Sequence, residues 1–411
     1  MKRRPLVLAA VGAALALVVG ASALAGSTRS TADPGITPTS ILLGGTVPLS
    51  GVASAYSAVA VGASAYFKYV NAKGGVNGRQ VDYKYLDDTY NPAQTIQLTR
   101  QLVEQDKVFA IFNTLGTETN HAIRPYLNQL KVPQLFAASG DTSFGADVAT
   151  YPMTIGFFPS YQAEGWALGQ YLKKSHPKAK IAVIAQNDSY GRDLLVGLKR
   201  GLAGGSAKVI AAQNYEVTAS DVGSQIAKLK SSGADTLAIF ATPQFAIQSY
   251  VFANKLGWKP FMVTNAVSSA SNIMLLASEG GANKTVLGSV SVVFLKDPTD
   301  PKWSKDPAIA LYRTILAKYA KGANAKDVYH VYGMAVAYAT VNLLKRLGKN
   351  PTRTGLIAAV DSMNIKDDPF LLPGIAIKTG PGDHFPLSQM YFQQYAKTGW
   401  KQFGSLVSYK G

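Results

Sequence analysis

Two loops in the first third of the chain carry residues that could bind a carboxylate. Residues 113–117 (NTLGT) follow the apolar segment VFAIF, and residues 138–142 (ASGDT) follow PQLFA. Free backbone N–H groups and hydroxyls at helix N-termini can hold an anion. The alternative is that these hydroxyls only cap helices. The candidate ligand-binding residues of the two loops are Leu115, Gly116, Thr117, Ser139, Gly140, Asp141 and Thr142.

Three aromatic residues could supply the apolar half of such a pocket. Tyr56 lies in a loop rich in serine and alanine, Tyr190 begins a predicted helix, and Phe294 ends a predicted strand. Aromatic rings bury a large area against a flat or apolar ligand. The alternative is core packing, which fits Tyr190 and Phe294 better than Tyr56.

Catalytic and metal-binding chemistry finds little support in the residue types. The chain has no cysteine, which excludes disulfides and thiolate nucleophiles. None of its four histidines lies in H-E-x-x-H, and neither G-x-S-x-G nor a phosphate-binding G-x-x-x-x-G-K-[ST] loop occurs. Asp87 and Asp88 are best interpreted as a turn and cap before Pro92, not as a metal pair. We therefore expect no catalytic residues, no metal and no cofactor.

The elements that must position these residues alternate between short apolar runs and longer amphipathic segments. Apolar runs without polar alternation are typical of strands covered on both faces, and strands alternating with helices predict doubly wound α/β domains. Both candidate loops lie at the carboxyl ends of such strands, where open α/β sheets bind ligands. The first cycle comprises strands at 41–47, 81–86, 108–112 and 133–138, and helices at 53–71, 92–105 and 119–130.

A second cycle of similar size follows, so the sequence predicts two lobes. Its strands are expected at 180–186, 208–215, 236–241, 260–264 and 286–294, and its helices at 162–175, 190–202, 221–231 and 245–256. The pattern then changes. Helices are expected at 308–319, 328–347 and 352–361, and a hairpin at 390–395 and 401–407.

The N-terminus is typical of a secretory signal peptide. Lys2, Arg3 and Arg4 precede an apolar run at 5–25 that ends in Ala-Leu-Ala. We expect cleavage after Ala25 and export of a soluble monomer to the periplasm, the cell surface or the medium. An uncleaved anchor is the alternative, because the run is about long enough to span a bilayer. Lipid attachment is excluded because the chain has no cysteine.

The formal net charge of +17 does not predict a nucleic-acid partner. Lys and Arg are scattered along the predicted helices, with no dense basic run interleaved with aromatics. A solvated basic surface is the simpler interpretation, with at most a modest general attraction for anionic solutes.

Four segments, in this order, resemble the leucine/isoleucine/valine-binding protein family, the branched-chain amino-acid receptors of ABC transporters. They are GGTVPLSG at 44–51, NAKGGVNG at 71–78, DD followed by NP at 87–92, and NDSYG at 187–191. The likeness covers roughly the whole mature chain. Residues 329–333 (YHVYG) and 385–390 (FPLSQM) look like the branch associated with aromatic acids.

The resemblance implies a type I periplasmic-binding fold, with two Rossmann-like lobes joined by a hinge. It implies lobe one at 36–157 plus 296–368, lobe two at 158–295 plus 369–411, and a solute carboxylate bound by the two loops. An ABC permease and ATPase are the implied partners. A sensory protein of the same fold remains an alternative, and a secreted enzyme is a more distant one.

One position departs from the family pattern. Amino-acid-binding members place an acidic residue after a strand of lobe two, and Asn265 takes that place here. Asparagine cannot neutralise a buried ammonium. We therefore expect a carboxylate without an α-ammonium to bind better than its amino-acid counterpart, unless Asp141 supplies the missing charge.

Overall fold

Strands and helices alternate through most of residues 32–409, which are the residues that the computed structural model describes. The predicted signal peptide at 1–25 lies outside them. Five parallel strands form the first sheet, in the order β2-β1-β3-β4-β5. These strands are β1 (Ser40–Val47), β2 (Gln80–Asp87), β3 (Ala110–Phe112), β4 (Gln134–Ala137) and β5 (Thr154–Gly156).

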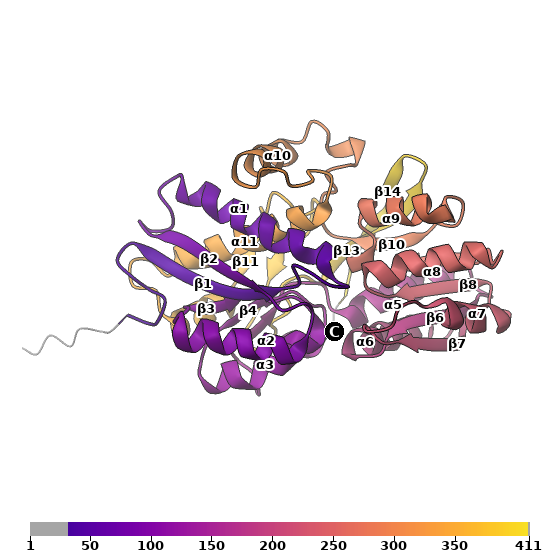
Figure 1. Cartoon of the computed structure of the whole chain (residues 1–411), viewed down its shortest axis with the longest axis horizontal. Helices are drawn as coiled ribbons and strands as arrows, with labels where there is room; N and C mark the ends of the chain where they lie inside the picture. Colours follow the sequence, from indigo (N-terminus) through magenta and orange to yellow (C-terminus); the bar gives the residue numbers. More distant parts are fainter. Residues whose placement is uncertain (1–31, 410–411) are drawn as a thin grey trace, which may run out of the picture. The chain divides into compact units, whose positions relative to one another are not determined.

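Helices cover both faces of this sheet, with α1 and α11 above it and α2 and α3 below it in Figure 1. The helices nearest this sheet in sequence or packing are α1 (Ser57–Asn71), α2 (Pro92–Arg100), α3 (Thr117–Gln129), α4 (Ser143–Ala146) and α11 (Val328–Arg346).

Successive residues of β1 enter different hydrophobic clusters, as the two-residue period of a strand requires. Ile41 and Leu43 belong to the cluster that contains the buried residues of α1 and α11. Leu42 packs against a smaller cluster that includes Ile123 and Leu127 of α3. The sheet is therefore buried on both faces, which explains why its strands are continuous apolar runs in the sequence.

The second sheet has seven strands in the order β14-β13-β10-β9-β8-β6-β7. Strands β10, β9, β8, β6 and β7 are parallel to one another. The hairpin of β13 and β14 joins β10 in antiparallel pairing. The strands are β6 (Lys180–Gln186), β7 (Lys208–Tyr215), β8 (Thr236–Phe240), β9 (Phe261–Thr264), β10 (Val290–Val293), β13 (Gln389–Ala396) and β14 (Gly399–Ser408). The helices of this part are α5 (Tyr161–Ser175), α6 (Ser189–Leu202), α7 (Gly223–Ser231), α8 (Pro243–Lys255) and α9 (Ser271–Ala277).

Three later helices pack in the same core as β1 and α1. They are α10 (Pro307–Tyr319), α11 and α12 (Arg353–Val360). Helices α1 and α11 approach closely at two glycines: a Cβ on Gly62 would lie 2.3 Å from His330 O, and one on Gly333 would lie 2.1 Å from Val59 O. Isolated bridges pair the chain segments that run from one sheet to the other. These bridges join Pro159 to Leu387 and Leu295 to Leu371.

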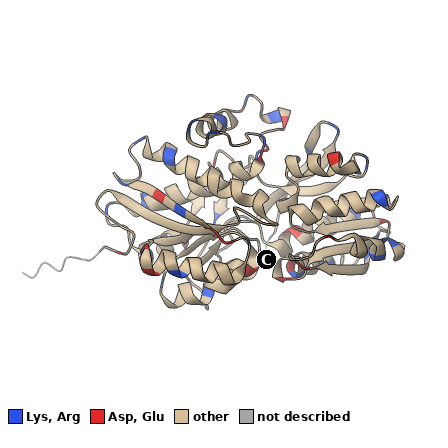
Figure 2. Cartoon of the chain, in the orientation of Figure 1, with Lys and Arg blue, Asp and Glu red and all other residues tan. Residues whose placement is uncertain are grey.

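The predicted elements are present with small shifts at their ends, and the terminal hairpin is confirmed. Several short elements were not predicted: β5 at the edge of the first sheet, α4, α9, and the two-residue strands β11 (Asn364–Ile365) and β12 (Ile377–Lys378). Within residues 32–409, no helix is long and apolar enough to cross a membrane. Figure 2 shows Lys and Arg spread over several helices and strands.

Candidate ligand-binding site

A cavity of about 80 Å³ is lined by residues from elements of both sheets. Of its 23 lining residues, eight are aromatic, ten are aliphatic and one is glycine. The remaining four have polar side chains. A pocket of this composition binds mainly by burying apolar surface, and its few polar groups orient the ligand. The eight aromatic lining residues are Tyr56, Tyr90, Phe158, Tyr161, Tyr190, Phe294, Tyr329 and Tyr332.

Five of the eleven residues predicted from the sequence line this cavity, namely Tyr56, Leu115, Gly116, Tyr190 and Phe294. The other six are not among the lining residues: Thr117, Ser139, Gly140, Asp141, Thr142 and Asn265. Two of these six tie the candidate loops together, because the hydroxyls of Thr117 and Ser139 are hydrogen-bonded at 2.8 Å. Ligand contact by any of the eleven remains a prediction.

Helix α3 begins at the cavity. Its N-cap residue, Gly116, lines the cavity with a φ of 109°, and no side chain caps the helix. A Cβ at Gly116 would lie 2.6 Å from both Thr119 Oγ1 and the Tyr90 ring, so only glycine fits here. The first N–H groups of a helix have no partner within the helix, and the helix dipole favours an anion beside them. This end of the cavity is therefore suited to a carboxylate.

Asp141 is engaged within its own loop. Its carboxylate accepts hydrogen bonds from Ser143 N at 2.9 Å and Ser143 Oγ at 2.6 Å, and lies 3.3 Å from His121 Nε2. Burial raises the pKa of Asp141, but the contacts with His121 and Ser143 outweigh it, and the pKa lies below its ordinary value. Asp141 was the alternative partner for an ammonium in place of an acid at position 265. Its carboxylate is already bonded to His121 and Ser143.

Two tyrosines converge on one backbone carbonyl in the cavity wall. Tyr56, just before α1, donates to Val267 O at 3.2 Å, and Tyr329 of α11 donates to the same oxygen at 2.7 Å. Their rings meet edge to face at 5.2 Å between centroids. Burial raises the pKa of both tyrosines well above the ordinary value, so both hydroxyls keep their protons. Val267 lies in the turn after β9. These bonds therefore join the start of α1 and helix α11, which pack on the first sheet, to a loop of the second sheet.

Behind this wall lie a buried amide and a buried carboxyl. Asn265, fully buried, donates from Nδ2 to the hydroxyl of Tyr190 at 2.6 Å. Glu164 of α5 accepts from the backbone N–H of Ala266 at 2.5 Å. Burial raises the pKa of Glu164 to about 8, so this side chain is mostly uncharged at neutral pH. Ala266 lines the cavity, and Glu164 therefore holds part of the cavity wall in place.

A family model described as periplasmic binding protein matches residues 40–400. The chain belongs to the periplasmic binding protein family. This periplasmic binding protein is 28% identical over 208 residues to the Leu/Ile/Val-binding protein homolog 1 of Brucella suis biovar 1 (strain 1330), covering 48% of this chain and 53% of that protein. The chain thus spans about half the length of the curated relatives it matches first. The predicted family resemblance is confirmed.

Solved structures show the same fold. A fatty acid ABC transporter substrate-binding protein from Thermomonospora curvata aligns with a TM-score of 0.77 at 20% identity, over 92% of this chain and 95% of that one. A branched-chain amino acid ABC transporter protein from Thermus thermophilus, with bound valine, aligns with a TM-score of 0.78 at 17% identity, over 90% and 96%. These likenesses confirm the predicted α/β fold of the periplasmic binding type.

Several cavity residues of this periplasmic binding protein were not among the sequence candidates. Tyr329 and Tyr332 lie in the YHVYG segment of α11. They are three residues apart, a spacing that places both on one side of a helix and could have been recognised in the sequence. Phe158, Tyr161 and Asp297 lie in or beside the segments that pass between the two sheets. No pattern in the sequence marks these three as facing a cavity, because their position depends on how distant elements meet.

Proposed function

We propose that this periplasmic binding protein is the extracytoplasmic solute receptor of an ABC importer, and that it captures a small carboxylate with an aromatic or branched apolar body. The observation that carries the proposal is the cavity, where eight aromatic side chains share the lining with Gly116, the N-cap of α3. The helix N-terminus suits the carboxylate, and the rings suit the apolar body. The names of the two structural neighbours refer to a fatty acid and to branched-chain amino acids, which share with this proposed solute a carboxylate and an apolar body.

Closure of two lobes around the solute is part of this proposal. Contacts between the proposed lobes support it: Val267 O accepts from Tyr56 and Tyr329, and Glu118 Oε1 accepts from Ser189 N at 3.0 Å. Few segments connect the lobes, which allows a hinge motion. The proposed lobes remain 36–157 plus 296–368, and 158–295 plus 369–411.

The absence of an anchor for an α-ammonium is a further part. Asn265 is uncharged and bound to Tyr190, and Asp141 is bound to His121 and Ser143. An α-ammonium beside the carboxylate would have no carboxylate partner at either of these positions. We expect 3-phenylpropionate and isocaproate to bind better than phenylalanine and leucine.

The proposed partners are the permease and ATPase of an importer, and the proposed state is an exported monomer without catalytic activity. The lining supports a binding role: its polar side chains outside the tyrosines are Thr242, Ser269, Asp297 and Gln393, which do not form a nucleophile–base pair. Export is tested by mass spectrometry of the secreted protein, which should begin near Gly26.

The experiment that tests the proposal is a thermal-shift screen of amino acids, aromatic acids, short-chain carboxylates and amides, followed by calorimetric titration. Thr117 and Ser139 do not line the cavity, but their hydroxyls remain the proposed hydrogen-bond donors to the carboxylate. The variants Thr117→Val and Ser139→Ala should therefore bind the selected carboxylate on the order of tenfold to a hundredfold more weakly. Ser231→Ala, which removes an exposed hydroxyl of α7, is the control and should bind as the wild type does. Wild-type affinity in both loop variants would refute the carboxylate site, and no binding by any carboxylate would refute the function.

Small-angle scattering tests closure independently. The radius of gyration should decrease when the selected carboxylate is added at saturation. An unchanged radius with a tightly bound ligand would contradict a closing cleft.

A further inference from the structure

The cavity contains one charged side chain, which the sequence did not single out. Asp297 is the only Asp, Glu, Lys, Arg or His among the lining residues, all of which lie in the described part of the chain. Its exposed fraction is 8%. Backbone pairing fixes the segment just before it, because Leu295 bridges Leu371 and Lys296 N donates to Phe370 O at 3.0 Å. The position of this carboxylate is therefore set by the fold.

The Asp297 carboxylate is hydrogen-bonded and forms no ion pair among the described residues, although Arg313 donates to O of the adjacent Pro298 at 3.0 Å. Its Oδ1 accepts from Thr299 N at 2.8 Å and Thr299 Oγ1 at 2.7 Å, and its Oδ2 accepts from Ser271 Oγ at 2.7 Å. These three bonds leave about one acceptor position of a carboxylate free. Lys296, its sequence neighbour, pairs with Asp306 at 2.9 Å. Among the described residues, no ion pair includes Asp297 within 4 Å.

A buried carboxylate without a cation is unfavourable, because its hydration is lost and no opposite charge replaces it. Burial raises the pKa of Asp297 by more than its hydrogen bonds with Thr299 and Ser271 lower it. A ligand that brings an ammonium to this carboxylate removes the imbalance. The same ammonium would gain little in a cavity lined only by apolar groups.

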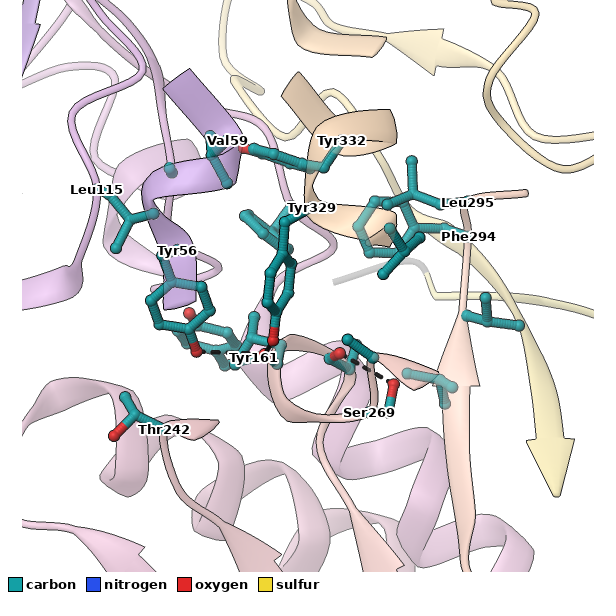
Figure 3. A pocket seen from close by; sticks show the side chains of 18 of the residues that line it. Tyr56, Val59, Leu115, Tyr161, Thr242, Ser269, Phe294, Leu295, Tyr329 and Tyr332 are labelled. Carbon is teal, nitrogen blue, oxygen red and sulfur yellow. Dashed lines mark hydrogen bonds between the residues drawn. The ribbon is translucent and has the colours of Figure 1, made fainter. Parts of the chain in front are cut away.

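Asp297 and the N-terminus of α3 each lie within two residues of a leucine that lines the cavity, Leu295 and Leu115. Figure 3 shows Leu115 and Leu295 on opposite sides of Tyr56 and Tyr329. Gly116 directly follows Leu115, and Asp297 is two residues beyond Leu295, a distance of at most about 7 Å. A ligand that reaches both groups must therefore place an apolar body between its carboxylate and its ammonium. An α-amino acid cannot do so, because its two charges share one carbon.

We propose that Asp297 binds a distal ammonium of the solute, so that the preferred ligand is an ω-amino carboxylate with an apolar middle. The inference rests on the proposed function, which supplies the carboxylate end at α3. It agrees with Asn265, which offers no charge to an α-ammonium, and it adds a specificity determinant on the segment between β10 and α10.

Calorimetric titration of the full-length mature protein tests this inference with matched probes. The first series is hexanoate, 6-aminohexanoate and norleucine, and the second is 4-methylbenzoate and 4-(aminomethyl)benzoate. In at least one series the distal amine should bind on the order of tenfold to a hundredfold more tightly than the compound without it. Norleucine, which carries the amine beside the carboxylate, should show no such gain over hexanoate.

Two variants assign the gain to the side chain. Asp297→Asn keeps a hydrogen-bond acceptor but removes the charge, so the gain from the distal amine should disappear while the affinity for hexanoate or 4-methylbenzoate is retained. Asp300→Asn is the control, because it removes a neighbouring negative charge that does not line the cavity and keeps a side chain able to cap the turn that follows. It should keep the gain.

The possible results separate this inference from the proposed function. Equal affinities for the compounds with and without the distal amine overturn the inference, as does an equal loss for both compounds in Asp297→Asn. If no carboxylate of either series or of the screen binds, the proposed function itself fails. If Asp297→Asn does not fold, the ranking of the probes by the wild type decides alone.

Discussion

Glu164 carries a prediction about stability that needs no ligand. Its carboxyl is buried behind the cavity wall and accepts a hydrogen bond from Ala266 N. Burial raises its pKa from 4.5 to about 8. The folded protein therefore binds a proton here more tightly than the unfolded chain does. Between these two pKa values the free energy of unfolding must fall as the pH rises, and above about pH 8 the loss is complete.

The size of the effect follows from the shift. Each pKa unit corresponds to about 1.4 kcal/mol, so the loss attributable to Glu164 is about 3 kcal/mol at pH 7 and about 5 kcal/mol above pH 8. Glu164→Gln removes the titration and retains an oxygen that can accept from Ala266 N. Relative to the wild type, this variant should therefore gain stability steadily as the pH rises from 4.5 to 8.

Urea unfolding of both proteins at pH 5, 7 and 8.5 measures this difference, with the free energy taken by linear extrapolation. Glu279→Gln, which replaces an exposed glutamate, controls for the loss of one negative charge. Any constant cost of burying the new amide cancels, because only the change with pH is compared. A wild-type-minus-variant difference that stays constant from pH 5 to 8.5 would refute the reasoning.

Three further substitutions probe the cavity and the core. Tyr329→Phe removes the 2.7 Å hydrogen bond to Val267 O, so titration of the selected carboxylate should show several-fold weaker binding, about 1 kcal/mol; unchanged affinity would contradict a role in closure. Gly116→Ala forces a Cβ to within 2.6 Å of the Tyr90 ring and should abolish measurable binding, whereas Gly74→Ala, equally left-handed with open space around it, should not. Gly62→Ala pushes a Cβ to 2.3 Å from His330 O and should lower the free energy of unfolding by about 1–3 kcal/mol, measured in urea; a stable variant would mean that α1 and α11 can separate without cost.

The fold was accessible from the sequence because most of its strands are buried on both faces. Strands covered on both sides are continuous apolar runs, and the predicted bounds 180–186 coincide with β6, which is buried along almost its whole length. β5 escaped prediction because three residues are too few to establish any period. α9 escaped because it has only seven residues and ends in a wide turn where Gly281 has a φ of 104°.

The cavity was only partly accessible because facing it is a property of tertiary packing. Tyr56 and Tyr66 lie ten residues apart near the same helix, yet Tyr56 lines the cavity while Tyr66 packs against Phe370 and Tyr338. The partner that distinguishes them, Val267, is 211 residues from Tyr56 in sequence. No local pattern contains that information.

The charges in the cavity also depend on tertiary packing, and this affects which ligand is predicted. Comparison with the family at one position found Asn265 where an acid is expected, and this predicts a ligand without an α-ammonium. The cavity does contain a carboxylate, Asp297, but it lies on a different segment, between β10 and α10. A ligand interacts with all the charges of a binding site at their positions in space. The loss of an acid at one position therefore removes one location for an ammonium. It does not determine whether the ligand has one.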